Sequence, residues 1–355
     1  MKIVLALAVA TLSSVATAAE VRLKMDSVKY TVGMSGDHVD STNVKARVLG
    51  VDIGVMLKDA ITEDLYYHAR LAGNFENGTN KATGLTAEYE PNQAVNLWEG
   101  GLVYTPTPYL RLEAGALNQN KHASPLLVWN TAFAGATQEL RYQGLYVRAQ
   151  QAIPNNNILS RRIGGIEEGT PLFFMETLGF DYDDNHLRFK AEASRFSFND
   201  LSSQVALTSQ DFGNSVVGAN QSARFLYGFR GTNISGELSY TTTESYKVML
   251  GGQYIFNEGA PDKRNQGHIA EVGAGMNGVL LKVGQFRNES DSAPAFYNAR
   301  LYGHNNMQGT VVTLQGQSKE LTFRVQAVQG RIIEQNIRQS DMNIINFAIV
   351  RHYEL

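Results

Sequence analysis

The chain has 355 residues, a formal net charge of −3 at pH 7, no cysteine, and 16 residues each of tyrosine and phenylalanine. The slightly acidic balance argues against a nucleic-acid partner and against a strongly basic surface. Mean hydropathy is −0.23, which excludes a bundle of transmembrane helices. Because cysteine is absent, something other than disulfide bonds must close the fold.

The N-terminal segment, residues 1–19, has the layout of an export signal. Lys2 supplies a positive start, residues 3–12 are mainly apolar, and Ala16-Thr17-Ala18 forms a small-residue cleavage motif. The apolar stretch is too short to cross a bilayer as a helix. An uncleaved anchor is the alternative. We expect a cleaved signal peptide at residues 1–19, followed by a single domain at residues 20–355.

From Val21 onward, apolar and polar residues alternate in short segments, and the longest uninterrupted apolar runs have four residues, as in Leu126–Trp129. A period of two residues indicates strands with one apolar and one polar face. The clearest apolar rows are Val28–Met34, Val51–Leu57, Leu65–Phe75, Leu110–Ala116, Leu187–Ala193, Ile234–Tyr240, Val248–Phe256, Val279–Val283, Leu321–Ala327 and Ile345–Leu355.

Tight connectors and long polar stretches separate these rows. The prolines fall in connectors or at strand edges, where a missing N–H costs no ladder hydrogen bond. The tight connectors are Thr105–Pro108, Asp183–Asn185, Asn277–Gly278 and Gln317–Glu320. The long stretches are residues 76–92, 118–138, 154–170, 199–221, 257–267, 288–308 and 331–342. Short turns that alternate with long loops are typical of a barrel in an outer membrane.

The pattern therefore predicts an all-β protein, a transmembrane antiparallel up-and-down β-barrel of sixteen strands, with eighteen as the alternative. A count of sixteen strands has a flaw, because it places the long stretches after Ile153 and Leu201 on the side of the short turns. A hairpin at Gln143-Gly144 and a weak strand within residues 205–217 would restore the alternation and give eighteen. At roughly ten spanning residues per strand, the chain length favours sixteen. A soluble two-sheet sandwich is the alternative fold. It fits the pattern less well, because the charged rows would then have to lie on the outer faces of both sheets.

The signal segment, the strand rhythm and the final strand resemble those of Gram-negative outer-membrane porins of the general-diffusion type. Such porins usually end in an aromatic residue after alternating apolar residues, a segment that the barrel-assembly machinery recognises. Phe347, Ile349 and Tyr353 match this pattern, whereas Leu355 replaces the terminal phenylalanine and Arg351 interrupts the row. The third loop lacks an acidic Pro-Glu-Phe-Gly-Gly segment, so the resemblance does not fix one porin family.

The resemblance implies a water-filled channel for passive diffusion of ions and small hydrophilic solutes, without a cofactor. It also implies an outer-membrane location, contacts with lipid and lipopolysaccharide, assembly by the barrel-assembly machinery, and a homotrimer. In porins of this size the third loop folds into the lumen. The counterpart here is residues 118–138, although a subunit or lipid contact is the alternative, and part of it could be a strand. Its constriction candidates are Lys121, His122 and Trp129.

Charges on the polar faces of the strands are the candidate pore-lining residues, because the field across a narrow aqueous lumen decides which ions pass. Their mixed signs predict modest ion selectivity. For each residue, a solvated charge far from the constriction is the alternative. The candidates are Arg70, Arg111, Glu113, Arg148, Arg188, Lys190, Glu192 and Arg324.

Two other classes remain as alternatives, a structural or receptor-type barrel without an open pore and an outer-membrane barrel enzyme. The segment Tyr302–Asn306 is faintly similar to the histidine segment of a lipase, but no serine follows at a useful spacing. No Cys/His cluster has the spacing of metal ligands. We therefore expect no catalytic residues and no metal site.

Overall fold

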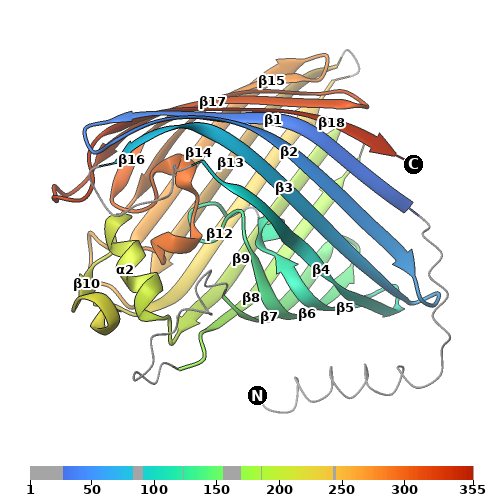
Figure 1. Cartoon of the computed structure of the whole chain (residues 1–355). Coiled ribbons are helices and arrows are strands. Elements are labelled where there is room, and N and C mark those ends of the chain that lie inside the picture. Colours follow the sequence, from blue (N-terminus) through green and yellow to red (C-terminus); the bar gives the residue numbers. More distant parts are fainter. Residues whose placement is uncertain are drawn as a thin grey trace.

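The computed structural model describes residues 27–82, 91–122, 124–154, 169–184, 186–242 and 245–354. The expected signal peptide and Leu355 lie outside these residues. Sixteen antiparallel strands form one closed barrel, in which sequence neighbours pair and the first strand pairs with the last (Figure 1). The sixteen-strand prediction is confirmed and the alternative of eighteen is wrong. The strands are β1 (Ser27–Ser41), β2 (Val44–Ala60), β3 (Leu65–Ala82), β4 (Gln93–Thr107), β5 (Leu110–Asn118), β6 (Ala132–Tyr142), β7 (Leu145–Ile153), β8 (Leu172–Asp183), β9 (Leu187–Asn199), β12 (Phe229–Thr241), β13 (Tyr246–Asn257), β14 (Gln266–Met276), β15 (Val279–Asn288), β16 (Met307–Gln317), β17 (Leu321–Ile332) and β18 (Met342–Glu354).

The two ends of the barrel differ in the length of their connections. The short connections share one end with the start of β1 and the end of β18, and the β1–β2 turn, residues 42–43, is the tight connection at the other end. Gln143 and Gly144, with φ angles of 46° and 88°, form the hairpin between β6 and β7, so the alternation holds with sixteen strands. Long connections occupy residues 83–92, 119–131, 154–171, 200–228, 258–265, 289–306 and 333–341.

The prediction of a weak strand within residues 205–217 is wrong. Residues Ser203–Asp211 form helix α2, and Ser202 Oγ accepts a hydrogen bond from the Val205 N–H as the N-cap. Val205, Ala206 and Ser209 are buried at helical spacing, which a period of two residues does not describe. Val216–Val217 (β10) and Arg224–Phe225 (β11) pair in a separate small sheet. In the residues that the structure describes, no helix has the length and apolar character needed to cross a bilayer.

The barrel wall is apolar outside and polar inside. Cross-strand partners lie on the same face. Val272 pairs with Val283 and Leu281 with Leu314, and all four are exposed on the outer face. Asn233, Gln253, Thr313 and Gln326 point to the inside and are buried. This distribution is the one that a barrel in lipid requires.

Some predicted strand limits were too short. β3 continues to Ala82, beyond the loop start expected at residue 76. The outer face of this extension carries Asn77, Thr79 and Lys81 in place of apolar residues, so alternation of hydrophobicity disappears although the ladder with β2 continues. The hydrogen-bond ladder therefore extends past the apolar band on this side of the barrel.

The seam between β1 and β18 is paired from Lys29 and Glu354 to Ser41 and Met342. At the end with short turns, the rings of Tyr30 and Tyr353 stack with centroids 4.7 Å apart. At the other end, Asn43 Nδ2 donates to the Arg338 carbonyl at 3.1 Å. Contacts of side chains thus fasten the seam at both of its ends.

Arg351, which interrupts the last apolar row, lies on the outer face near the end of β18. Its guanidinium donates to the Glu320 carboxylate at 2.9 Å and lies 5.1 Å from the ring centroid of Tyr353. The β16–β17 turn therefore supplies a partner for this charge.

Candidate functional site

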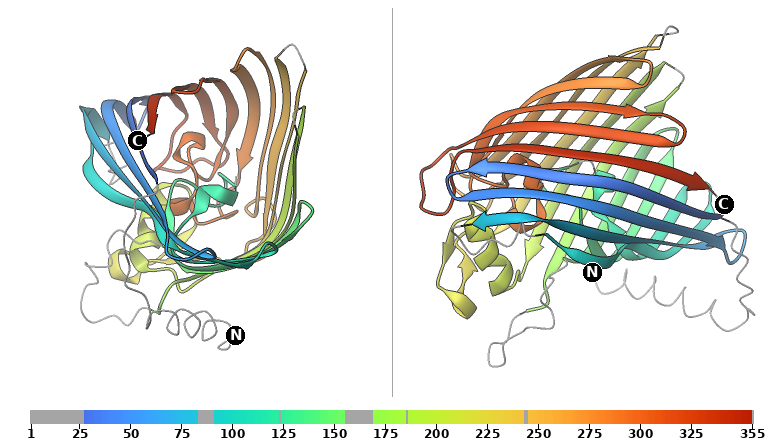
Figure 2. Two further views of the ribbon diagram at one scale, coloured as in Figure 1. Left: turned by 90° about the vertical axis from the view of Figure 1, so that its right-hand side faces the viewer. Right: turned by 45° about the horizontal axis from the view of Figure 1, so that its top comes forward.

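The β5–β6 loop, residues 119–131, folds into the barrel. It starts with the 3-10 helix η1 (Gln119–His122). Leu126 N donates to Gln253 Oε1 on β13 at 3.0 Å, and Asn233 Nδ2 on β12 donates to Ser124 Oγ at 2.9 Å. Because β12 and β13 lie far around the ring from β5 and β6, the loop crosses the interior (Figure 2).

The predicted limits of this loop, 118–138, were too wide. Asn118 belongs to β5 and residues 132–138 to β6. On the inward face of β6, Phe133 and Thr137 flank Gly135, while Ala134 and Ala136 lie outside. Small residues on both faces reduced the apolar contrast, so the strand resembled a loop in the sequence.

An apolar cluster inside the barrel receives the loop. Leu126, Leu127 and Val128 are almost fully buried, and Trp129 is half-buried against the same cluster. The ring of Phe133 meets that of Tyr297 edge-on, with centroids 5.2 Å apart. Burial of this apolar surface stabilises the inward position by roughly 25 cal/mol per Å².

A second connection, the β15–β16 loop at residues 289–306, also folds inward, and the sequence did not indicate it. It contains the 3-10 helices η4 (Ala295–Tyr297) and η5 (Arg300–Tyr302). Its Tyr297 carbonyl accepts from Trp129 N at 2.7 Å, and Ala299 N donates to the Pro125 carbonyl at 2.8 Å. The two inward loops are therefore hydrogen-bonded to each other inside the ring (Figure 2).

Buried asparagines hold the second loop in place. Asn305 Nδ2 donates to the Ser290 and Ala293 carbonyls at 2.9 and 2.6 Å. Asn305 Oδ1 accepts from Asn288 and Asn298, each at 2.6 Å. These bonds satisfy polar groups that would be costly to bury alone.

Asp291 ties the same loop to the segment that follows α2. Its carboxylate accepts from Ser215 N at 2.8 Å and from Ser215 Oγ at 2.7 Å. Burial raises the pKa of the Asp291 carboxyl above its ordinary value. The loop is thus fixed by short polar contacts in a water-poor environment.

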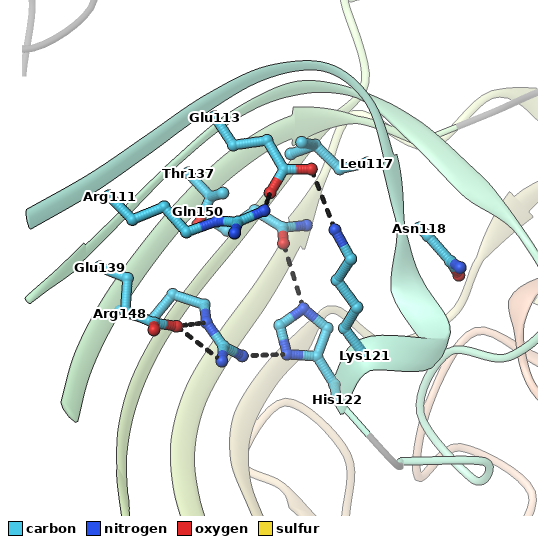
Figure 3. A pocket seen from close by; sticks show the side chains of 10 residues that line it. All are labelled: Arg111, Glu113, Leu117, Asn118, Lys121, His122, Thr137, Glu139, Arg148 and Gln150. Atoms are coloured by element: carbon cyan, nitrogen blue, oxygen red, sulfur yellow. Dashed lines mark hydrogen bonds and ion pairs between the residues drawn. The ribbon is translucent and has the colours of Figure 1, made fainter. Parts of the chain in front are cut away.

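A cluster of charged side chains lies where the β5–β6 loop meets the wall (Figure 3). Glu113 on β5 is bound by Arg111 at 2.8 Å, by Lys121 of the loop at 3.0 Å and by His68 of β3 at 3.3 Å. The Glu113 side chain is 3% exposed, whereas those of Arg111 and Lys121 are 39% and 43% exposed. The carboxylate lies deep, and the two cations extend toward the lumen.

Two further carboxylates complete the charged cluster. Glu139 on β6 is bound by Arg148 at 2.9 Å and by Arg141 at 3.0 Å. Glu192 on β9 is bound by Lys190 at 3.1 Å and Arg148 at 3.7 Å, and it accepts from the Tyr146 hydroxyl. Arg148 thereby links the two carboxylates.

His122 anchors the loop to this wall as a neutral imidazole. Arg148 Nη1 lies 3.2 Å from His122 Nδ1, and because arginine only donates, Nδ1 must be the acceptor. Nε2 therefore carries the proton and donates to Gln150 Oε1 at 3.1 Å, and Gln150 Nε2 donates to Gln119 Oε1 at 2.9 Å. Burial, followed by the Arg148 charge, lowers the pKa of His122 to about 4.

We expect acid to loosen the loop through His122. A free imidazole has a pKa of about 6.5, so below that pH a released loop binds a proton that the docked loop does not bind. The inward position of the β5–β6 loop should therefore be fully stabilised above pH 6.5. The free energy that favours this position should fall by about 1.4 kcal/mol per pH unit between pH 6.5 and about pH 4. Recordings in bilayers should show rising current noise between pH 7 and pH 4.

The variant His122→Gln is the control, since its side chain cannot gain a proton in this range. The charges nearest the imidazole, Arg148, Lys190 and Glu192, are unchanged in it. Equal noise in both proteins across this range would show that His122 does not control docking.

A cavity of about 270 Å³ lies beside the charged cluster. The buried Thr137 hydroxyl at this cavity has no hydrogen-bond partner among the described residues. The cavity is lined by Arg111, Glu113, Leu117, Asn118, Lys121, His122, Thr137, Glu139, Arg148 and Gln150 (Figure 3).

The structure brings together most of the charges predicted to line a pore, although their role stays a prediction. Arg111, Glu113, Arg148, Lys190 and Glu192 belong to the charged cluster, as does Lys121 of the predicted constriction.

Three candidates lie apart from it. Arg70 stacks over the Trp98 ring at 5.4 Å, Arg188 pairs with Asp183 at 3.8 Å near the short turns, and Arg324 is on β17, far around the ring.

Sequence reasoning missed Glu139, Arg141 and His68 as parts of this site. Glu139 and Arg141 flank Leu140, so alternation could have found them if β6 had been recognised. His304, in the segment similar to a lipase, is buried and stacks on Phe212 at 4.1 Å. Among the described residues, no group of three or more His, Asp or Glu side chains could hold a metal ion.

Comparison with known proteins gives similarity in structure alone. No family model and no curated protein matches the sequence. The fold is similar to OprB of Pseudomonas putida, with 9% identity, a TM-score of 0.62, and coverage of 92% of this chain and 93% of that one. It is also similar to a triple mutant of the Rhodopseudomonas blastica porin, with 6% identity, a TM-score of 0.51, and coverage of 92% and 99%. The chain therefore has the barrel fold of these two proteins.

Proposed function

We propose that this protein is a porin, a water-filled channel through which ions and small hydrophilic solutes diffuse passively. The observation that carries the proposal is a closed barrel, apolar outside and polar inside, whose inward loop places exposed charged side chains at the lumen. A narrow aqueous path lined by charge is what selects solutes in a channel. The similarity of the fold to the Rhodopseudomonas blastica porin supports this proposal.

The channel lies in the outer membrane of a Gram-negative bacterium. The segment 1–19 has the layout of a cleaved export signal, which supports this location. There the exposed apolar band contacts lipid and lipopolysaccharide, and the barrel-assembly machinery inserts the chain. We also propose a homotrimer, by analogy with porins of this size.

A receptor-type or structural barrel is the second candidate, and one observation favours it. Both the β5–β6 and the β15–β16 loops occupy the interior and bond to each other, which reduces the open cross-section. We propose no catalytic function.

Purified protein in a planar bilayer tests these two candidates. We expect discrete conductance steps, in groups of three for a trimer, and a gel mobility that changes on heating, because a closed barrel resists detergent until it is heated. A heat-dependent mobility without conductance at any voltage would favour the receptor-type barrel. A mobility independent of heat would contradict the membrane barrel itself.

A further inference from the structure

We infer that the cavity beside the β5–β6 loop binds the oxyanion of a small solute, a carboxylate or a phosphate, and that the channel prefers anions. This inference rests on the proposed channel function and names its solute class. It differs from the modest selectivity that the mixed signs of the sequence predict. The two expectations differ because the structure shows how deeply each charge is buried, and the sequence does not.

In the charged cluster, Glu113 and Glu192 are the most deeply buried charges, whereas the most exposed ones are cations. Side-chain exposure is 3% for Glu113 and 1% for Glu192, against 39% for Arg111 and 43% for Lys121. A solute in the lumen therefore meets the cations first. The carboxylates behind them fix the positions of the cations and weaken their field without reversing it, because Coulomb energy falls with distance.

The balance of charge in the cluster is also positive. Three carboxylates, Glu113, Glu139 and Glu192, are paired with five cations, and a further acid, Asp181, lies 3.9 Å from Arg141. Including Asp181, the cluster holds five positive and four negative charges, a net of one positive charge. The five cations are Arg111, Lys121, Arg141, Arg148 and Lys190.

The wall across the lumen repeats this arrangement. Asp37 on β1 is 14% exposed and is bound by Arg300 of the β15–β16 loop, which is 41% exposed. Arg324 on β17 is exposed as well. Cations thus extend toward the lumen from both inward loops and from two parts of the wall.

The cavity offers donors suited to an oxyanion. Arg111 and Lys121 lie at its edge, and a guanidinium matches the two oxygens of a carboxylate or phosphate. The Thr137 hydroxyl and the Gln150 and Asn118 amides add neutral hydrogen-bonding groups. At about 270 Å³, the cavity is below the roughly 300–1,000 Å³ of sites for drug-sized ligands, so it suits a small solute.

A cation would bind poorly in the same place. The carboxylate oxygens of Glu113 already have Arg111, Lys121 and His68 as partners. An incoming cation would have to displace one of them, and the exposed positive charges of Arg111 and Lys121 would repel it.

Ion selectivity is the first test, measured as the reversal potential of the open channel across a KCl gradient. We expect chloride to be more permeant than potassium in the native protein. Lys121→Gln should lower the chloride-to-potassium permeability ratio by about twofold or more, and Lys121→Arg should retain it. Arg195→Gln is the matched control, because Arg195 lies on the outer face and binds Glu258.

Binding is the second test, measured as block of the current by succinate, by inorganic phosphate and by 1,4-diaminobutane at equal concentration. We expect both oxyanions to block, the diamine not to block, and Lys121→Gln to weaken the block by about fivefold or more. Block by succinate without phosphate would narrow the site to carboxylates.

The outcomes separate the inference from the function on which it rests. A chloride-to-potassium ratio of one or less, block by the diamine, or equal values for native protein and Lys121→Gln would overturn the inference while leaving the channel intact. Absence of conductance from heat-modifiable protein would instead refute the channel function.

Discussion

Replacing residues 124–129 of the β5–β6 loop by a short Gly-Ser linker is expected to raise single-channel conductance severalfold and to admit larger sugars. These residues carry the span that crosses the interior, anchored through Ser124 and Leu126 to β12 and β13. A linker without Leu126, Leu127 and Trp129 has no apolar surface to hold it against the cluster. Conductance steps and the rate of liposome swelling in sugars of increasing size measure the effect.

The matched control is a Gly-Ser replacement of Pro261–Lys263 in the β13–β14 loop, where all three residues are exposed. Its conductance should equal that of the native protein. If the β5–β6 replacement leaves conductance unchanged and the proposed trimer dissociates, this loop acts as a contact between subunits, and the constriction lies elsewhere.

Asn305→Ala is expected to release the β15–β16 loop from the interior. The substitution removes a side chain with four buried partners, the Ser290 and Ala293 carbonyls and the amides of Asn288 and Asn298. A buried polar group left without a partner costs about 1–3 kcal/mol, so the loss is large for one loop. Trypsin added to the folded protein should then cleave after Arg300, which mass spectrometry detects.

The control is Asn336→Ala in the β17–β18 loop, whose side-chain bonds are exposed to solvent. It should leave the β15–β16 loop as resistant as in the native protein. Resistance of Asn305→Ala to trypsin after Arg300 would show that other contacts, such as those of Asp291, suffice to hold the loop.

The barrel could be predicted because lipid and water impose opposite demands on its two faces. Each strand must alternate, so β5, β9 and β17 stand out in the sequence without any knowledge of their neighbours. The prediction was poor where that demand is relaxed. β6 carries small residues on both faces, the extension of β3 is polar on both faces, and α2 follows a helical period.

Only part of the candidate site could be predicted as single residues, and its arrangement could not. Alternation placed Arg111, Glu113 and Arg148 on the inner face. The sequence did not show that Lys121, eight residues beyond Glu113, returns to the Glu113 carboxylate, because that contact depends on the path of the loop. Nor did it show that Asn305 and its partners turn a polar stretch inward, since asparagines are equally common in exposed turns.

The seam between β1 and β18 has a consequence for how solutes leave the barrel. The ends of a chain are the natural places for a ring of strands to separate, because no covalent link joins them. Here the stacked rings of Tyr30 and Tyr353 close one end, and the bond from Asn43 to Arg338 closes the other. To unzip, the two strands must lose an aromatic stack or an interloop bond before the first ladder bond breaks. Opening of the seam toward the bilayer is thereby opposed at both of its ends, so the proposed channel would conduct along the axis of the barrel.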